Sequence, residues 1–496
     1  MLKTIRVIGG GLAGSEAAYR LATRGFPVEL WEMRPVRGTE AHKTEGLAEL
    51  VCSNSFKSLS LTTAPGILKA EMDRLGSLAL AAARRAAVPA GEALSVDRDL
   101  FSDFVTRALE SHPQITIRRE EFTELDRLTD SPIIVATGPL TSPALAQALT
   151  DISGEKEFYF YDAISPIMAR SGIDFTKAFL ANRHGKLSRQ FESEPTQSSS
   201  EEGDYINCPL SKEEYETFVD ALLAAERVAS KDFERVKHFE GCMPIEEMAD
   251  RGRDTLRFGP MRPIGIEDPR TGRRPWAVVQ LRPENREATM YNLVGFQTKM
   301  KYGEQKRVFS LIPGLENAEF LRMGSMHRNS FVDAPRVLSP SLSLKRAPRI
   351  YLAGQITGVE GYMESAATGI LAAIFLEAEL EGRAAPLPPR GTALGALLAH
   401  LGNTASPDFQ PMGINFGLFD ESCFQTTLEK ITAAFPKRRK IPKAEKREAI
   451  GNAALENLRA YQDKLHSLDE ASARMRNSPH PSAKETAYDQ SNRYHQ

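Results

Sequence analysis

Four cysteines are the candidate nucleophiles of this sequence, and they are widely separated: Cys52, Cys208, Cys242 and Cys423. None of them forms a CxxC pair or joins histidines at a zinc-binding spacing, so the sequence predicts no metal site. Cys242 has the most suggestive surroundings, because Pro244 and the glutamates after it mark a helix start, and a helix N-terminus favours a thiolate. A buried cysteine that only fills space is nevertheless common. On the residues alone, both roles stay open.

A glycine-rich turn lies between two apolar segments at the start of the chain. TIRVI and PVELW are typical of buried strands, and SEAAYRLATR between them has helical periodicity. The turn carries GxGxxG, which lets backbone N–H groups approach a pyrophosphate at the helix N-terminus. Glu32 ends the second strand, where a carboxylate accepts a ribose hydroxyl and repels the 2′-phosphate of NADP. The predicted dinucleotide-binding residues are Gly9, Gly10, Gly11, Leu12, Ala13, Gly14 and Glu32.

Two later segments read as strands that end in glycine-bearing turns. SPIIVATGPLTS places Thr137 and Gly138 after a strand. APRIYLAGQITGVEGYMESAATG places Gly354 and Gln355 after another strand and begins a helix near Tyr362. Together with the first unit, these segments resemble flavoproteins of the glutathione-reductase type, in which a late strand and helix return to the flavin. The resemblance implies FAD rather than NAD, with Tyr362 either stacked on the flavin or folate ring or buried as a core tyrosine.

The order of these segments predicts an α/β fold with a discontinuous, Rossmann-like FAD-binding domain. We expect this domain to comprise residues 1–165 and 331–440, with a smaller inserted α/β domain at 166–330. A helical or disordered extension is expected at 441–496. Residues 186–204 are rich in Ser and Glu and lack periodicity, which predicts a mobile loop.

Composition and charge exclude an intrinsically disordered chain and a small disulfide-stabilised one. Lys and Arg number 63 and Asp and Glu 65, giving a net charge of −2, and 41% of the residues are hydrophobic. The chain is therefore an ordinary globular one, and any nucleic-acid surface must be a local basic patch. Charges such as Arg84 interrupt the longest apolar stretches, so no membrane span is expected. The absence of a signal-peptide cleavage site and the scattered thiols predict a cytoplasmic protein.

Several longer segments, in order along the chain, resemble one family. EAHKTEGLAELVCSNSFKS, IIVATGPLTS, FEGCMPIEEMADRG, YNLVGFQTKMKYGEQKRVF and AGQITGVEGYMESAATG look like TrmFO, the folate- and FAD-dependent tRNA uracil-5-methyltransferases of bacteria. The resemblance runs from residue 4 to about Leu418. The 186–204 loop and the tail after about Lys440 depart from it.

The resemblance implies a reaction and its participants. Methylenetetrahydrofolate would supply the carbon, reduced FAD the hydride, and NADH or NADPH would reduce the flavin. The product would be ribothymidine in the T-loop of the tRNA T-arm. Because C5 of uracil is a poor nucleophile, a thiolate must first add at C6. By the resemblance Cys242 in EGCMP is that thiolate, while Cys52 in LVCSNS either captures the methylene group or removes the C5 proton.

RNA contact is expected from local basic clusters, namely Arg251/Arg253, Arg273/Arg274, Lys299/Lys301, Lys306/Arg307 and Lys437–Lys440. Two other functions remain open at this point. One is an FAD-dependent oxidoreductase of a small molecule, whose activity would survive Cys242→Ala. The other is a wobble-uridine tRNA-modifying flavoprotein, whose family is normally longer. The oligomeric state cannot be predicted from the sequence.

Overall fold

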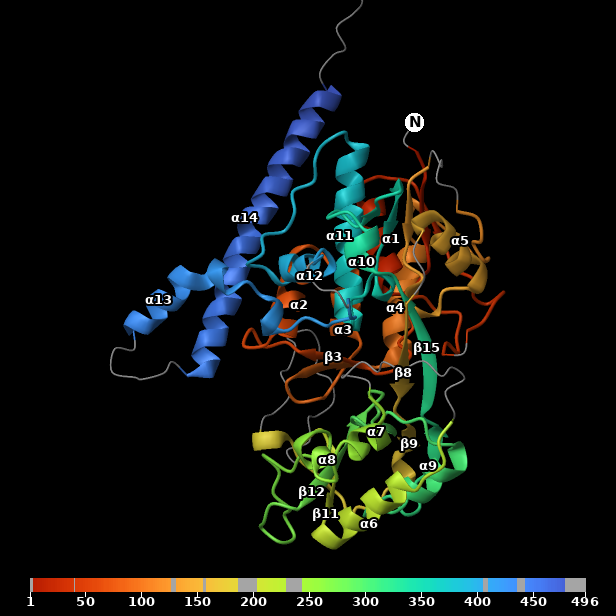
Figure 1. The fold of residues 1–496 in the computed structure, drawn as a ribbon, viewed down its shortest axis with the longest axis vertical. Helices are drawn as coiled ribbons and strands as arrows, with labels where there is room; N and C mark the ends of the chain where they lie inside the picture. Colours follow the sequence, from red (N-terminus) through yellow and green to blue (C-terminus); the bar gives the residue numbers. More distant parts are fainter. Residues whose placement is uncertain are drawn as a thin grey trace, which may run out of the picture.

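The computed structural model describes residues 3–39, 41–125, 131–154, 158–185, 203–228, 243–404, 409–434 and 442–477. The predicted loop at 186–204 therefore lies almost wholly outside the described residues. The chain forms two bodies, one above the other in Figure 1, with a long C-terminal helix along one side of the upper body. Among the described residues, no helix is long and apolar enough to cross a membrane.

A six-stranded sheet forms the centre of the upper body, in the order β16-β17-β7-β1-β2-β6. All of its pairings are parallel except that of β16 with β17. Its central strands β1 and β7 are almost wholly buried, as expected of a parallel sheet, whereas only Ile115 of the edge strand β6 is buried. The bounds are β1 (Ile5–Ile8), β2 (Val28–Trp31), β6 (Ile115–Arg118), β7 (Ile133–Val135), β16 (Ser343–Leu344) and β17 (Ala347–Leu352). The predicted Rossmann-like, discontinuous fold is confirmed, because β16 and β17 complete a sheet begun by the first residues.

Helices pack around this sheet, and two of them approach each other closely. A Cβ atom on Gly369 would overlap with the carbonyl group of Ala13, so α1 and α11 meet backbone to backbone at this point. The helices are α1 (Leu12–Thr23), α2 (Ala64–Arg74), α3 (Leu78–Arg85), α4 (Arg98–Glu110), α5 (Pro143–Ser153), α10 (Ala334–Val337), α11 (Tyr362–Leu380) and α12 (Ala393–Leu401). A small sheet of β3 (Ser55–Ser58), β5 (Ala93–Val96) and β4 (Ala87–Val88) completes the body.

The lower body contains an antiparallel sheet with a separate hydrophobic core. Its strands run in the order β10 (Phe179–Leu180), β11 (Ile206–Leu210), β12 (Ala277–Pro283), β13 (Met290–Leu293), β9 (Ile167–Ala169) and β14 (Phe320–Arg322). Its helices are α6 (Lys212–Leu223), α7 (Ile245–Asp250), α8 (Thr255–Phe258) and α9 (Tyr302–Phe309). We call this unit the inserted domain and the upper body the Rossmann domain.

Two long strands connect the domains. β8 (Phe158–Ile164) and β15 (Ser325–Phe331) pair antiparallel along their whole length, with Ile164 opposite Ser325. The pair runs from the Rossmann domain towards the inserted domain (Figure 1). The chain therefore leaves and re-enters the Rossmann domain at neighbouring points.

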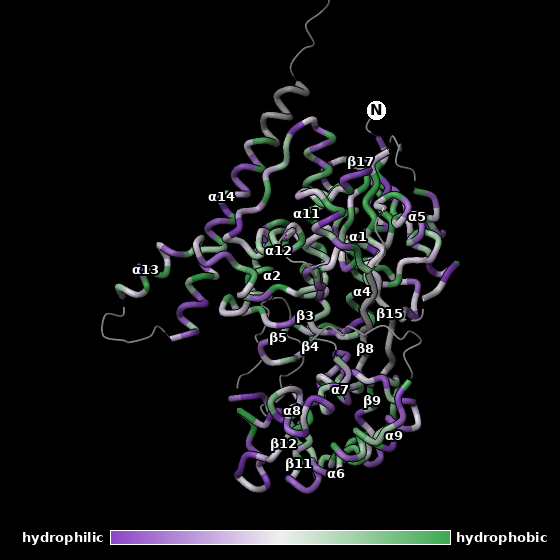
Figure 2. The backbone as a smooth tube through the Cα atoms, in the orientation of Figure 1, coloured by the Kyte–Doolittle hydropathy of each residue, from purple (hydrophilic) through white to green (hydrophobic). Residues whose placement is uncertain are grey.

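The C-terminal part forms the helices α13 (Gln425–Ala434) and α14 (Lys443–Asn477). Five apolar residues of α14 are buried in the Rossmann core, on one face of the helix: Ile450, Ala454, Leu458, Tyr461 and Leu465. Figure 2 shows hydrophobic stretches at the centre of the upper body and hydrophilic ones on its outer helices. The predicted helical part of this extension corresponds to α14, and its tail from residue 478 lies outside the described residues.

Candidate active site

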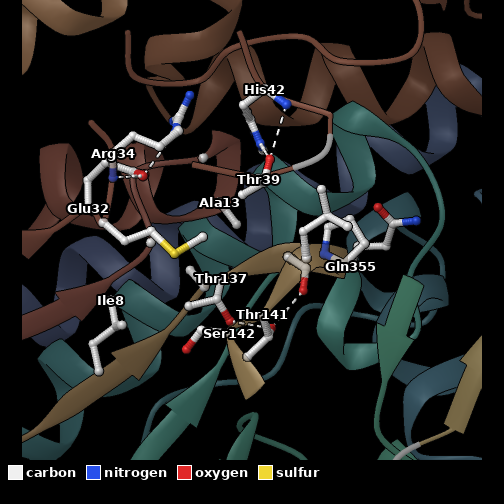
Figure 3. Close-up of a pocket in the computed structure, with 18 of the residues that line it drawn as sticks. Ile8, Ala13, Glu32, Arg34, Thr39, His42, Thr137, Thr141, Ser142 and Gln355 are labelled. Carbon is white, nitrogen blue, oxygen red and sulfur yellow. Dashed lines mark hydrogen bonds and ion pairs between the residues drawn. The ribbon is translucent and has the colours of Figure 1, made fainter. Parts of the chain in front are cut away.

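A cleft opens at the carboxyl ends of the parallel strands β1, β2, β7 and β17, where this class of sheet binds ligands (Figure 3). Ten of the predicted cofactor residues line it: Gly9, Gly11, Leu12, Ala13, Glu32, Thr137, Gly138, Gly354, Gln355 and Tyr362. Gly10 and Gly14 lie in the same turn but do not line the cleft. The structure thus brings together residues from four distant parts of the sequence.

The glycine turn has no room for side chains on its inner side. Gly9 has a φ of 102°, and a Cβ atom there would lie 2.5 Å from the carbonyl oxygen of Ala136. A Cβ atom on Gly14 would overlap with the carbonyl oxygen of Gly9. Gly11, by contrast, has open space beside it and starts α1 without a side-chain cap. The first turn of α1 therefore offers its N–H groups and positive dipole end to the cleft, which fits a pyrophosphate.

Glu32 is 6% exposed and is held from both sides. Its Oε2 accepts the N–H of Gly10 at 2.9 Å, and its Oε1 accepts the backbone N–H and the Nε of Arg34 at 3.0 and 2.9 Å. Burial alone would raise the pKa of Glu32, but the hydrogen bonds and charge of Arg34 outweigh it and lower the pKa. Glu32 is therefore an ionised acceptor whose remaining lone pairs suit a ribose hydroxyl.

Further polar residues line the cleft that the sequence analysis did not single out. Thr39 Oγ1 lies 2.7 Å from His42 Nδ1, and Thr137 Oγ1 lies 2.7 Å from Thr141 Oγ1 (Figure 3). Among the polar residues of the cleft lining are Arg34, Thr39, His42, Glu49, Thr141 and Ser142. Those at 34–49 fall within or beside a segment that resembles the family, but no spacing rule assigns them to a cofactor.

Cys52 lies beside the cleft, where it contacts Tyr362 of the cleft lining. The Cys52 Sγ lies 3.0 Å from the hydroxyl oxygen of Tyr362, which also accepts the N–H groups of Cys52 and Ser53 at 2.9 and 3.2 Å. Because two donors occupy the lone pairs of this oxygen, its own proton is directed to the sulfur. Burial raises the pKa of Tyr362 well above its usual range, so the hydroxyl keeps that proton. The tyrosine thus contacts the Cys52 segment through its hydroxyl, a contact that the sequence did not reveal.

Two arginines lie close to this thiol. Arg98 Nη1 donates to the carbonyl of Leu50 at 2.7 Å, and Arg322 Nη2 donates to the carbonyl of Val51 at 2.8 Å. Arg98 also forms an ion pair with Glu284 of the inserted domain at 2.6 Å. Burial lowers the pKa of Arg322, and the charge of Arg98 lowers it further. The two residues before Cys52 are therefore held by arginines, one of which is paired with Glu284.

The other cysteines differ in their surroundings. Cys242 lies outside the described residues, whereas α7 begins at Ile245 with Pro244 as its N-cap, where the sequence predicts a helix start. Cys208 is fully buried in the inserted domain, and burial raises its pKa. Cys423 is exposed. Cys208 is thus part of the core of the inserted domain, and Cys423 is open to solvent.

Many of the basic candidates for RNA contact already have acidic partners. The ion pairs are Arg253–Asp220, Lys299–Glu247, Lys301–Glu226 and Arg307–Glu304. Within the described ranges, four exposed candidates form no ion pair: Arg251, Arg273, Arg274 and Lys306. Lys437–Lys440 lie outside those ranges. The four exposed residues are thus the better candidates.

Comparison with known proteins gives consistent similarities. The family model described as glucose inhibited division protein A matches residues 4–384. The methylenetetrahydrofolate--tRNA-(uracil-5-)-methyltransferase TrmFO of Geobacter sulfurreducens is 56% identical over 419 residues, or 84% of this chain and 93% of that protein. TrmFO of Azorhizobium caulinodans is 56% identical over 85% of this chain and 89% of that protein. TrmFO of Enterococcus faecalis is 49% identical over 92% of this chain and 98% of that protein.

Two solved structures share the fold. They are Aquifex aeolicus GidA in its form II and form I crystals, with TM-scores of 0.64 and 0.63 at 17% and 16% identity. The similarity covers 96% and 97% of this chain and 76% and 92% of those chains. At such identities the likeness concerns the fold alone.

Proposed function

This chain belongs to the TrmFO family, within the broader family described as glucose inhibited division protein A, and on this premise we propose that it methylates C5 of a uracil in tRNA. The carbon comes from methylenetetrahydrofolate. The identity of 56% over most of the chain is the observation that carries this proposal. The contact of Cys52 with Tyr362 supports it, because it places a thiol next to a residue that lines the cleft.

FAD is the cofactor that the cleft fits. The N–H groups of the Gly11–Ala13 turn suit its pyrophosphate, and Glu32 suits a ribose hydroxyl. Gly354 and Gln355 return to the same cleft from the late strand β17. When bound and reduced, FAD supplies the hydride that converts the transferred carbon to a methyl group. NADH or NADPH reduces the flavin between turnovers. Because this reductant binds only transiently, it needs no second GxGxxG motif.

The two thiols have separate tasks. Cys242 adds to C6 of the uracil, which raises the electron density at C5 and makes that carbon a nucleophile. Cys52 then captures the methylene group or removes the C5 proton, with Tyr362 donating a hydrogen bond to its sulfur. The substrate base is the T-loop uridine, which must leave the tRNA stack before a thiol reaches it. The product is ribothymidine.

The test follows labelled carbon from methylenetetrahydrofolate into an unmodified tRNA transcript, with FAD-loaded protein and NADPH. A parallel reaction contains S-adenosylmethionine as the labelled donor. We expect label in tRNA only from the folate, and its loss in Cys242→Ala and in Cys52→Ala. Cys423→Ala is the matched control, since this cysteine is exposed and its substitution should leave transfer unchanged.

Two results would contradict the proposal. Absence of label from the folate, in a protein that binds FAD and oxidises NADPH, would favour an oxidoreductase of a small molecule. Label that appears at a wobble uridine rather than in the T-arm, located by nuclease mapping, would favour the other tRNA-modifying alternative.

A further inference from the structure

The segment that carries Cys52 is held at every residue by a side chain from elsewhere in the chain. Arg98 holds the carbonyl of Leu50, Arg322 that of Val51, and Tyr362 the N–H groups of Cys52 and Ser53. Arg282 holds the side chains of the next two residues, Ser53 and Asn54. The position of this thiol is therefore determined by contacts that are remote in sequence.

Arg282 makes the most extensive of these contacts. Its Nε donates to Asn54 Oδ1 at 2.9 Å, and its Nη2 donates to Ser53 Oγ at 2.9 Å and to Asn292 Oδ1 at 3.4 Å. Asn54 is fully buried and in addition donates to the carbonyl oxygens of Val96 and Pro283. The arrangement is a buried polar network that joins β5 of the Rossmann domain to β12 of the inserted domain.

The acceptors of Arg282 are all neutral. The residue is 7% exposed, and in the part of the chain that the structure describes it forms no ion pair with a carboxylate. A buried cation without an opposite charge costs free energy, which its hydrogen bonds offset only in part. Its hydrogen bond to Ser53 places that charge beside the residue that follows Cys52.

Both Arg282 on β12 and Arg322 on β14 belong to the inserted domain, whereas Cys52 belongs to the Rossmann domain. We propose that Arg282 is a positioning residue for Cys52, so that the reactive geometry of this thiol is completed only when the inserted domain is docked. The inference rests on the proposed function in that it takes Cys52 as one of the two reactive thiols. Its consequence is that the inserted domain contributes to both thiols, since Cys242 lies within that domain in sequence.

The experiment measures how fast iodoacetamide alkylates Cys52 in the FAD-loaded protein, with peptide mass spectrometry reporting each cysteine separately. In Arg282→Gln we expect the rate at Cys52 to fall about tenfold, the size expected for the loss of one hydrogen bond from a charged donor. The rate at exposed Cys423 should stay unchanged and serves as the internal reference. The bound FAD and its visible spectrum should also be retained.

Tyr205→Phe is the matched control variant. The Tyr205 hydroxyl crosses the same domain boundary and donates to the carbonyl of Ala90 at 3.1 Å, but it does not touch the Cys52 segment. We expect it to leave the alkylation of Cys52 unchanged. Ser53→Ala removes one acceptor of Arg282 and should slow alkylation in the same direction, which keeps the test valid if Arg282→Gln does not fold.

An unchanged or faster reaction of Cys52 in Arg282→Gln or in Ser53→Ala would overturn the inference. An equal slowing in Tyr205→Phe would overturn the role assigned to Arg282, because the loss of any contact between the domains would then slow Cys52 as much. Alkylation needs neither tRNA nor folate, so failure of methyl transfer in the unmodified protein would refute the proposed function alone. In a protein that does transfer methyl groups, Arg282→Gln should lower kcat more than it changes the KM for tRNA.

Discussion

The Glu32 side chain contributes both to the structure of the cleft and to its charge. It binds the turn through the N–H of Gly10 and binds Arg34, which in turn pairs with Glu49 at 3.0 Å. Arg34 is buried with it. Such a buried pair stabilises the fold little in total, but removing one member leaves an uncompensated charge. Glu32 therefore stabilises the structure of the cleft, in addition to offering an acceptor for a ligand.

The pH dependence of Glu32 can be predicted from its lowered pKa. A carboxylate with a folded-state pKa below its ordinary value of 4.5 stabilises the fold above that value and loses this effect as the pH falls below it. We expect FAD to dissociate and the unfolding temperature to drop on acidification below pH 4.5. In Glu32→Gln the FAD affinity should already be reduced about tenfold at about pH 7, and the pH dependence should be smaller. Unfolding curves with an unaltered acid slope in Glu32→Gln would contradict this assignment.

Contacts between individual residues also show which features could not be predicted from the sequence. The glycines and Glu32 could be predicted because a strand, a turn and a helix in one short stretch fix their positions. The contact of Cys52 with Tyr362 joins residues 310 positions apart, and that of Arg282 with Asn54 joins residues 228 apart. No local pattern specifies such pairs, since they arise from how the two domains dock.

Among the elements, α1 and α11 pack closely against each other. A side chain at Gly369 would meet the backbone of Ala13, in the helix whose first turn faces the cleft. We expect Gly369→Ala to lower the stability by about 2 kcal/mol through overpacking and to weaken FAD binding. The measurements are thermal unfolding and flavin retention on gel filtration.

Gly303→Ala is the control for that substitution. Gly303 lies in α9 with nothing within 4 Å of an added Cβ atom. Its replacement should be neutral or should stabilise the protein by up to about 1 kcal/mol, because alanine favours helix. Equal effects of the two substitutions would show that α1 and α11 are not tightly constrained.

α14 provides a second prediction for an element. Five of its side chains are part of the Rossmann core, and Arg74 of α2 donates to the carbonyl of Leu455 at 2.8 Å. Deleting residues 443–496 should therefore cost more than about 5 kcal/mol, at roughly 1.5–3 kcal/mol for each large apolar side chain exposed. Deleting only 478–496 should leave the unfolding midpoint in urea unchanged. An unchanged free energy of unfolding in the protein that lacks α14 would show that this helix does not stabilise the Rossmann domain.

The strands differed in how far they could be predicted. Four strands of the Rossmann sheet, β1, β2, β7 and β17, are short apolar runs that lie where the sequence predicts strands, whereas β6 and β16 were not predicted. The order of the antiparallel sheet was not predictable, because β12 pairs with β11 across a long intervening segment and β9 pairs with β13 and β14. Pairings of this kind depend on side-chain packing between distant strands.

For the whole molecule, a net charge of −2 means that tRNA must be bound by local surfaces. Arg273 and Arg274 are exposed on a hairpin of the inserted domain, where Asp268 bridges to Arg273 through the backbone. We expect Arg273→Gln with Arg274→Gln to weaken tRNA binding. The slope of log affinity against log salt should fall by about one unit for each phosphate that the variant no longer binds. Filter binding at several salt concentrations measures both.

Arg253→Gln is the matched control, because Arg253 already pairs with Asp220 at 2.6 Å. It should change the salt dependence of tRNA binding less than the double substitution does. A salt slope that neither variant alters would place the RNA-binding surface elsewhere on the molecule.

The sheet order also bears on how the protein is made. β7 lies between β1 and β17, yet β17 follows the entire inserted domain in the sequence. While a ribosome synthesises residues 136–346, β7 is an open edge strand with apolar residues, a surface prone to associate with other chains. The inserted domain can complete its own sheet once β14 has emerged. The Rossmann sheet of the nascent chain stays incomplete until β17 has been synthesised. We therefore expect slow translation or a shortage of chaperones to cause aggregation through β7.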